Sequence, residues 1–190
     1  GSFDITYLST LPNFIVMAPS DEAELVKMIN TSMDINDKPS AIRYPRGTGI
    51  GLELPSIEEN IEIGKGRIIQ EGKQVCILSI GTRLEECKIA AEELKNKGIN
   101  STIVDARFIK PLDQELILKC AREHELLITV EEGSIGGFGS HVENLLSENG
   151  IFDKGLKFRS MTLPDIFIEQ DNPKKMYDVA GLNSSQISKK

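Results

Sequence analysis

Tryptophan is absent from this sequence of 190 residues, aromatic residues make up only 5% of it, and it contains only two histidines and three cysteines. With so few aromatic residues, we expect a core built from Ile, Leu, Val and Ala. Two histidines exclude a metal site made mainly of imidazole ligands. Cys76, Cys87 and Cys120 have no metal-ligand spacing and cannot all pair, so we expect buried, reduced thiols.

Positive charge and long apolar runs are also scarce. The sequence has 22 Lys and Arg against 29 Asp and Glu, which gives a formal net charge of −7. Because a nucleic-acid-binding domain needs a basic face, we expect no nucleic-acid partner. No apolar run approaches the roughly 20 residues that a membrane span requires, so we expect no membrane partner either.

Short apolar runs alternate with helical patterns along most of the chain. The runs at 75–79 (VCILS), 101–105 (STIVD), 126–130 (LLITV) and 158–163 are expected to be strands, with helices between them. Such alternation implies right-handed crossovers and predicts an α/β fold, with a mostly parallel sheet and helices on both faces. A hairpin between 66–69 and 75–79, around Glu71-Gly72-Lys73, would add one antiparallel edge strand.

The first 55 residues show a different organisation. Strands are expected at 14–17 and 41–44, and between them a helix that Ser20 caps, with Leu25, Met28, Ile29 and Met33 as its apolar positions. One β–α–β unit cannot cover both faces of its own sheet, so other strands must complete it. The stretch 47–60 has three glycines, Pro55 and several acids and is typical of a linker. We therefore predict two domains, an incomplete one at 1–55 and a second at 56–190.

The segment Arg43-Tyr44-Pro45-Arg46-Gly47 is the sharpest candidate for chemistry. Tyr44 precedes a proline and is therefore held extended. The two arginines lie three positions apart, where a predicted strand ends. The carboxyl ends of parallel strands face the ligand crevice of such sheets, and a guanidinium group there can bind a phosphate bidentately. The alternative is that both arginines form surface ion pairs with nearby acids.

Glu131 and Glu132 follow another predicted strand. Adjacent strand residues point to opposite faces, so these carboxylates would not share one substrate proton, and we expect a structural role such as a contact with a neighbouring subunit. The loop Gly133–Gly139 (GSIGGFG) has amides that could hold a phosphate, but its spacing differs from that of nucleotide-binding loops and favours a tight β–α turn. His124 and His141 lie near helix ends and are expected to be structural.

Several segments, in the order of the chain, resemble one enzyme family. They are GSFDITYL (1–8), LPNFIVMAPSD (11–21), PSAIRYPRG (39–47), IGKG (63–66), DARFIKPLD (105–113), TVEEGSIGGFG (129–139) and LPDIFI (163–168). Together they resemble the 1-deoxy-D-xylulose-5-phosphate synthases. The RF-x-KPLD and GGFG segments are also similar to those of 2-oxoacid dehydrogenase β subunits and transketolases, whereas YPRG combined with LPD-x-FI favours the synthase.

The resemblance implies a homodimeric transferase of three α/β domains that depends on thiamine diphosphate and Mg²⁺. That enzyme joins pyruvate, after decarboxylation, to D-glyceraldehyde 3-phosphate, in the bacterial cytoplasm or, less favoured, the plastid, and serves isoprenoid and thiamine biosynthesis. The resemblance implies that 1–55 is the C-terminal end of a pyrimidine-binding domain and that 56–190 is a transketolase-type C-terminal domain. It also implies that Arg46 binds the phosphate of the aldehyde substrate.

In that family the metal-binding segment, the activating glutamate and the active-site histidines would all precede Gly1. We therefore expect no catalytic, cofactor-binding or metal-binding residue in this chain, no bound thiamine diphosphate or Mg²⁺, and no activity of the chain alone. Two alternatives remain open. One is the C-terminal domain of a 2-oxoacid dehydrogenase β subunit, acting in subunit assembly. The other is a free-standing module that binds a phosphorylated ligand at the Gly133–Gly139 loop.

Overall fold

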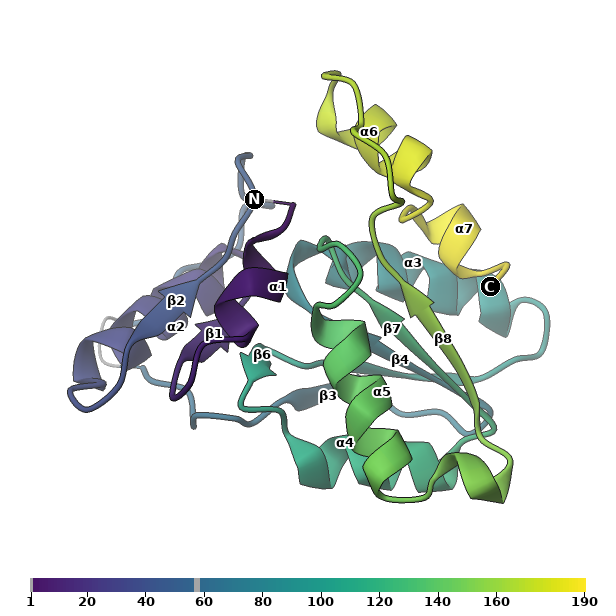
Figure 1. Cartoon of the computed structure of the whole chain (residues 1–190). Coiled ribbons are helices and arrows are strands. Elements are labelled where there is room, and N and C mark those ends of the chain that lie inside the picture. Colours follow the sequence, from purple (N-terminus) through teal and green to yellow (C-terminus); the bar gives the residue numbers. More distant parts are fainter. Residues whose placement is uncertain (1, 57–58) are drawn as a thin grey trace.

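The computed structural model describes residues 2–56 and 59–190, which form two sheets flanked by helices (Figure 1). Gly1, the first residue of the predicted first domain, and residues 57–58, part of the predicted linker, lie outside the described residues. The strands are β1 (Ile15–Met17), β2 (Ser40–Ile42), β3 (Arg67–Gln70), β4 (Val75–Ser79), β5 (Ser101–Asp105), β6 (Phe108–Lys110), β7 (Leu126–Val130) and β8 (Lys157–Met161). The helices are α1 (Asp4–Ser9), α2 (Glu22–Asp34), α3 (Leu84–Lys95), α4 (Gln114–Glu123), α5 (Phe138–Glu148), α6 (Pro173–Ala180) and α7 (Ser184–Ile187), with 3-10 turns η1 (Gly81–Arg83) and η2 (Phe152–Lys154).

The larger sheet has the strand order β3-β5-β4-β7-β8, in which only the β3–β5 pairing is antiparallel. The mostly parallel sheet and its antiparallel edge strand are confirmed. The predicted hairpin is wrong, because β3 pairs with β5 and not with β4. Gly72 serves another purpose: a Cβ there would lie 2.3 Å from the carbonyl carbon of Ser101, so the chain passes closely over the start of β5 before it enters β4 at the centre of the sheet.

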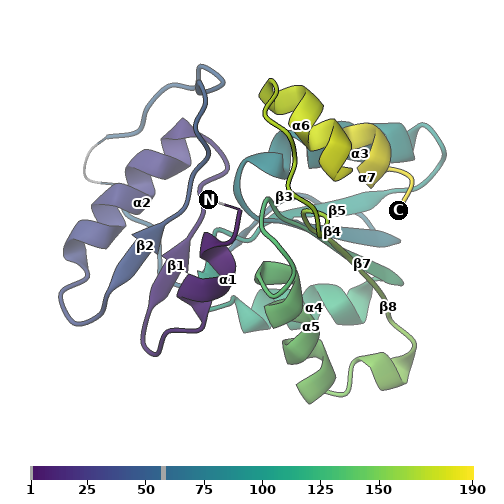
Figure 2. The same ribbon diagram turned by 45° about the horizontal axis from the view of Figure 1, so that its top comes forward.

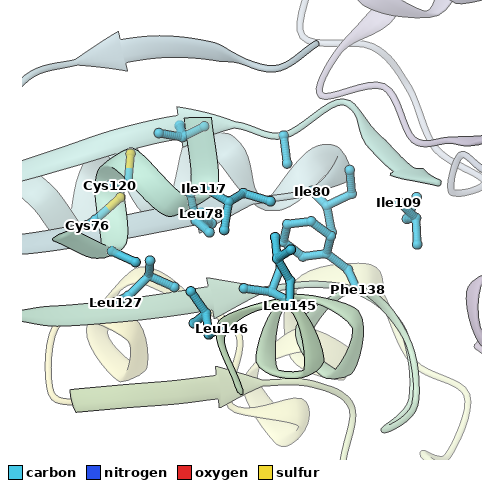
Figure 3. Packing of buried hydrophobic residues seen from close by; sticks show 14 of the residues in the cluster. Cys76, Leu78, Ile80, Ile109, Ile117, Cys120, Leu127, Phe138, Leu145 and Leu146 are labelled. Atoms are coloured by element: carbon cyan, nitrogen blue, oxygen red, sulfur yellow. The ribbon is translucent and has the colours of Figure 1, made fainter. Parts of the chain in front are cut away.

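Helices cover both faces of this sheet (Figure 2). On one face, α4 and α5 pack Ile117, Phe138 and Leu146 against β4 and β7 (Figure 3). The other face is covered mainly by α3 and the C-terminal segment. The residues after 182, which the sequence suggests to be a polar tail, form α7, whose Ile187 is 1% exposed. A single isoleucine among polar residues gives no periodic signal, so this docking is not visible in the sequence.

The smaller sheet has the order β2-β1-β6, and its third strand comes from the second predicted domain. β2 runs parallel to β1, whereas β6 pairs antiparallel with β1. The core beneath α2 contains Met17 and Met28 together with Ile61 and Phe108. The β–α–β pattern predicts that the opening segment cannot close a core by itself, and the structure agrees. The strand that it gains within the described residues is β6, which comes from further along the chain.

The start of α2 differs from the prediction. Asp21, not Ser20, caps the helix by accepting a hydrogen bond from the Glu24 amide at 2.8 Å. The Ser20 hydroxyl instead donates to Asp21 and, at 3.0 Å, to the buried Asp105 at the end of β5. The apolar positions also differ, because Met28 is buried but Met33 is 75% exposed. Glu24 is buried together with Met28 on the inner face of the helix, whereas Met33 is not.

Buried charges join the smaller sheet to the larger one. Glu24, only 1% exposed, accepts two hydrogen bonds from Arg107, at 2.7 Å and 3.0 Å, and forms an ion pair with Arg67 at 3.1 Å. Arg67 also pairs with Asp105 at 3.0 Å. Removing one partner from such a buried pair is strongly destabilising, so this network fixes how α2 sits against β3 and β5. None of the helices in residues 2–56 and 59–190 has both the length and the apolar character that a bilayer crossing requires.

Candidate functional site

A pocket of about 370 Å³ lies where the carboxyl ends of strands from both sheets meet. Its polar side is formed by the segment after β2 and by Glu132, the second residue after β7. Further lining residues come from the segment after β8 and from α6. The full lining is Ser2, Phe3, Arg43, Tyr44, Pro45, Arg46, Glu132, Ser134, Leu163, Pro164, Ile166, Phe167, Ile168, Pro173, Met176 and Tyr177. Strand ends of parallel sheets are where α/β folds place their ligands.

Glu132 is the centre of a buried polar network beneath this pocket, and we call its members (Arg43, Thr82, Arg83, Glu132 and Tyr177) the Glu132 network. The Glu132 carboxylate accepts hydrogen bonds from Arg43 and Thr82, from Arg83 Nε at 3.0 Å, and from the Tyr177 hydroxyl at 2.9 Å. Burial would raise the pKa of this carboxyl. The positive charge of Arg43, the Thr82 hydroxyl and the positive charge of Arg83 outweigh burial and hold the pKa below its ordinary value.

Arg83 and Tyr177 also contact each other directly. The Arg83 guanidinium carbon lies 3.6 Å from the centre of the Tyr177 ring, which is a cation–π contact. Burial and the neighbouring Glu132 carboxylate raise the pKa of the Tyr177 hydroxyl to about 12, so this hydroxyl remains a hydrogen-bond donor at neutral pH. The tyrosine is therefore held both by its ring and by its hydroxyl group.

The two arginines after β2 have different environments. Arg43 is committed to Glu132, and its Nε also lies 3.8 Å from a carboxylate oxygen of Asp4. Its side chain is only 10% exposed, so it forms a buried ion pair and not the surface pair considered from the sequence. Arg46 is exposed and lines the pocket. Within residues 2–56 and 59–190 no hydrogen bond or ion pair of its side chain is found.

Glu131 points away from Glu132, as the alternation along a strand predicts. It accepts hydrogen bonds from the Phe138 amide at 3.0 Å and the Gly139 amide at 2.8 Å, at the start of α5. The amides that could have held a phosphate at the glycine-rich loop are therefore occupied by a carboxylate of the chain itself. The tight β–α turn is confirmed, and a phosphate could bind these two amides only by displacing Glu131. Because Glu132 is equally buried, neither carboxylate is free to contact a neighbouring subunit.

The histidines and cysteines have structural surroundings. His124 donates from Nδ1 to the Cys120 carbonyl at 2.8 Å, near the end of α4, and its Nε2 lies 2.7 Å from the Thr102 hydroxyl. Burial, followed by the positive charge of Lys110, lowers the pKa of His141. All three cysteines are buried and free, as expected, and the thiols of Cys76 and Cys120 face each other in the core (Figure 3).

The model of the transketolase C-terminal domain matches residues 64–187 of this chain, which is more than half of its length. The chain belongs to the transketolase family. The model of the transketolase pyrimidine-binding domain matches residues 1–49, so this family member combines part of that domain with a C-terminal domain. Its fold class is therefore confirmed: a mostly parallel α/β C-terminal domain preceded by a partial pyrimidine-binding domain.

Two solved structures are similar to this transketolase-family chain. The first is described as a split-gene transketolase in an inactive β4 tetramer; it has 29% sequence identity and a TM-score of 0.84, and the match covers 98% of this chain and 59% of that one. The second is a transketolase from Campylobacter jejuni subsp. jejuni, with 18% identity and a TM-score of 0.70, covering 98% of this chain and 27% of that one. At that identity the second likeness shows the fold alone. The 2-oxoacid dehydrogenase alternative is not better supported.

Two features of the described residues of this transketolase-family chain bear on the cofactor of the family. No group of three or more His, Cys, Asp and Glu side chains in residues 2–56 and 59–190 is placed to hold a metal ion. The helix start most suited to a diphosphate, at Phe138 and Gly139, is bound by Glu131. Arg46 is an exposed cationic side chain on the lining of the pocket.

Three residues of the Glu132 network were not recognised in the sequence. Thr82 and Arg83 lie in η1, the turn that follows β4, so the strand-end argument that selects Arg43 and Arg46 would also have selected them. Tyr177 lies in α6, a helix none of whose residues is fully buried. Nothing in the sequence around it indicates a long-range contact with Glu132.

Proposed function

We propose that this transketolase-family chain is the C-terminal portion of a 1-deoxy-D-xylulose-5-phosphate synthase. The enzyme condenses pyruvate and D-glyceraldehyde 3-phosphate with loss of CO₂, depends on thiamine diphosphate and Mg²⁺, and serves isoprenoid and thiamine biosynthesis. The family membership supports a thiamine-diphosphate-dependent transferase, and the combination of YPRG at 44–47 with LPDIFI at 163–168 supports the synthase. Both of these segments line the same pocket, although they are far apart in the sequence.

Arg46 is the residue that we assign to the substrate phosphate. The observation that carries this assignment is its position: an exposed guanidinium group at the carboxyl end of β2, on the wall of the pocket, whereas the neighbouring Arg43 is already committed to Glu132. A guanidinium group matches a phosphate bidentately, and it remains charged at all physiological pH values. In this proposal the chain contributes substrate binding, while decarboxylation and carbon–carbon bond formation take place on segments that it does not contain.

The domain division, the assembly and the location belong to the same proposal. We assign residues 1–55 to the end of the pyrimidine-binding domain and 56–190 to the C-terminal domain. We further propose that the complete enzyme is a homodimer in the bacterial cytoplasm. The β4 tetramer of the similar split-gene transketolase supports self-association, since the match to that protein covers 98% of this chain.

Replacing Arg46 with Ala in the complete enzyme tests the phosphate role. A charge-assisted hydrogen bond contributes about 1.5–3 kcal/mol, which corresponds to a loss of roughly 10- to 150-fold in kcat/KM for D-glyceraldehyde 3-phosphate. The KM for pyruvate should stay within about twofold, because pyruvate carries no phosphate. Arg122→Ala, an exposed arginine on α4 far from the pocket lining, is the matched control. Equal losses for both substrates would show that Arg46 does not select the phosphate.

A further inference from the structure

The Glu132 network is costly to bury. Two guanidinium groups and one carboxylate are removed from water, and Arg43 Nε is buried without a hydrogen-bond partner among the described residues. A buried ion pair is weak evidence for stability, since well-packed apolar side chains often serve equally well or better. A buried polar network instead specifies the geometry of the groups that it joins, and here four donor residues converge on one carboxylate. The question is therefore which groups this network holds in place.

Its donors come from three segments that are remote from Glu132 and from one another in the sequence. Arg43 follows β2, Thr82 and Arg83 form the turn after β4, and Tyr177 belongs to α6. Arg43 and Tyr177 also both line the pocket that contains Arg46. The carboxylate thus contacts both the segment that carries the proposed phosphate ligand, through Arg43, and helix α6, through Tyr177.

Helix α6 depends strongly on this connection. None of its residues is fully buried, and of its side chains only Tyr177 and Ala180 pack at the edge of the core. Tyr177 is held by the cation–π contact with Arg83 and by its hydrogen bond to Glu132. On the other side, Arg43 lies only three residues before Arg46, with the rigid Pro45 between them, so the direction in which Arg46 leaves β2 follows the position of Arg43.

We propose that Glu132 is a positioning residue that couples helix α6 to the Arg43–Arg46 segment, so that the docking of α6 through Tyr177 sets the orientation of Arg46 in the pocket. Glu132 acts through Arg43 and does not touch the ligand. The coupling is a property of this chain, whereas its consequence for phosphate binding rests on the function proposed for Arg46.

Tyr177→Phe is the primary variant because it removes one hydroxyl group and keeps the ring that Arg83 contacts. Glu132→Gln would leave the buried Arg83 without its carboxylate partner and Arg43 with only the more distant Asp4, and would endanger the fold. Amide hydrogen exchange of the isolated chain should become about 10-fold faster in residues 173–180 and also several-fold faster in residues 43–47. Exchange in β5 and β7 should not change. Tyr7→Phe, an exposed tyrosine outside the pocket lining, should change neither segment.

Faster exchange in residues 173–180 alone would overturn the proposal, because α6 would then be tethered to Glu132 without any effect on Arg43. A second measurement concerns the ligand. In titrations of the chain with D-glyceraldehyde 3-phosphate, followed by NMR, Tyr177→Phe should weaken binding about 3- to 10-fold, and unchanged affinity would equally overturn the proposal. If the unmodified chain does not bind the ligand, or if Arg46→Ala binds it equally well, the phosphate role of Arg46 is refuted. The hydrogen-exchange result alone then decides whether α6 is coupled to residues 43–47.

Discussion

The buried carboxyl of Glu131 should make the stability of this chain fall as pH rises. Burial raises its pKa from 4.5 to about 7, and the amides of Gly139 and Phe138 offset this only in part. Between these two values the native state holds a proton that the unfolded state has released, so the free energy of unfolding decreases with pH in this window. Each pKa unit corresponds to about 1.4 kcal/mol, and the whole shift corresponds to about 3 kcal/mol.

The assay is urea unfolding at fixed protein concentration from pH 4.5 to 8, for the unmodified chain and for Glu131→Gln. Gln does not titrate, so subtracting its curve removes the contribution of Asp105, whose pKa burial also raises. Relative to the variant, the unmodified chain should lose about 3 kcal/mol over the window and then level off above pH 7. Glu143→Gln, on the exposed side of α5, is the control and should leave the pH dependence unchanged. A flat difference curve would mean that the carboxylate is already ionised at low pH, held by the two amides, and would refute the reasoning.

Two further predictions concern the first turn of α5 and the cofactor. Gly139→Ala should destabilise the chain by about 1–3 kcal/mol in urea unfolding, because its new Cβ would lie 2.3 Å from Ser160 Oγ and 2.7 Å from Thr129 Oγ1. The control is Gly47→Ala, which has open space around it and should destabilise the chain far less. Equal losses of stability for the two variants would contradict this packing. Titration calorimetry of the chain with thiamine diphosphate and Mg²⁺ should show no tight binding, since the described residues offer no group of three metal ligands. Tight, Mg²⁺-dependent binding would contradict the proposal that cofactor binding requires other segments.

The larger domain could be predicted well from the sequence because its signals are local. The runs 75–79, 101–105 and 126–130 coincide with β4, β5 and β7, and Asp113 caps α4 by accepting a hydrogen bond from the Leu116 amide. Each depends on apolar periodicity or on a cap within a few residues. The partner of β3 could not be predicted in the same way. A short turn with a glycine indicates a hairpin with the next strand, but it does not show whether these two strands are neighbours in the sheet, and β3 in fact pairs with β5.

The smaller sheet and the site depend on contacts between residues that are remote in the sequence. For that reason, the pairing of β6 and the partners of the site residues could not be predicted from local sequence patterns. β6 is only three residues long and pairs with β1, which lies more than ninety positions earlier, so no local pattern reveals it. Strand ends identified Arg43, Arg46, Glu131 and Glu132 as residues of interest. Their different roles follow from partners such as Tyr177 and Phe138 that only the folded chain brings to them.

The strand β6 has a consequence for how the two parts of this chain can be separated. The natural place to divide the polypeptide is the stretch between residues 47 and 60, yet Phe108 and the β6 backbone lie beyond it and complete the sheet before it. Cutting the chain in that stretch would therefore not separate two independently packed units, because residues on both sides of the cut share one core. If the C-terminal part is transferred to another protein, the segment before residue 47 loses the edge strand β6. The transfer must therefore include that segment, or the segment left behind needs another strand in place of β6.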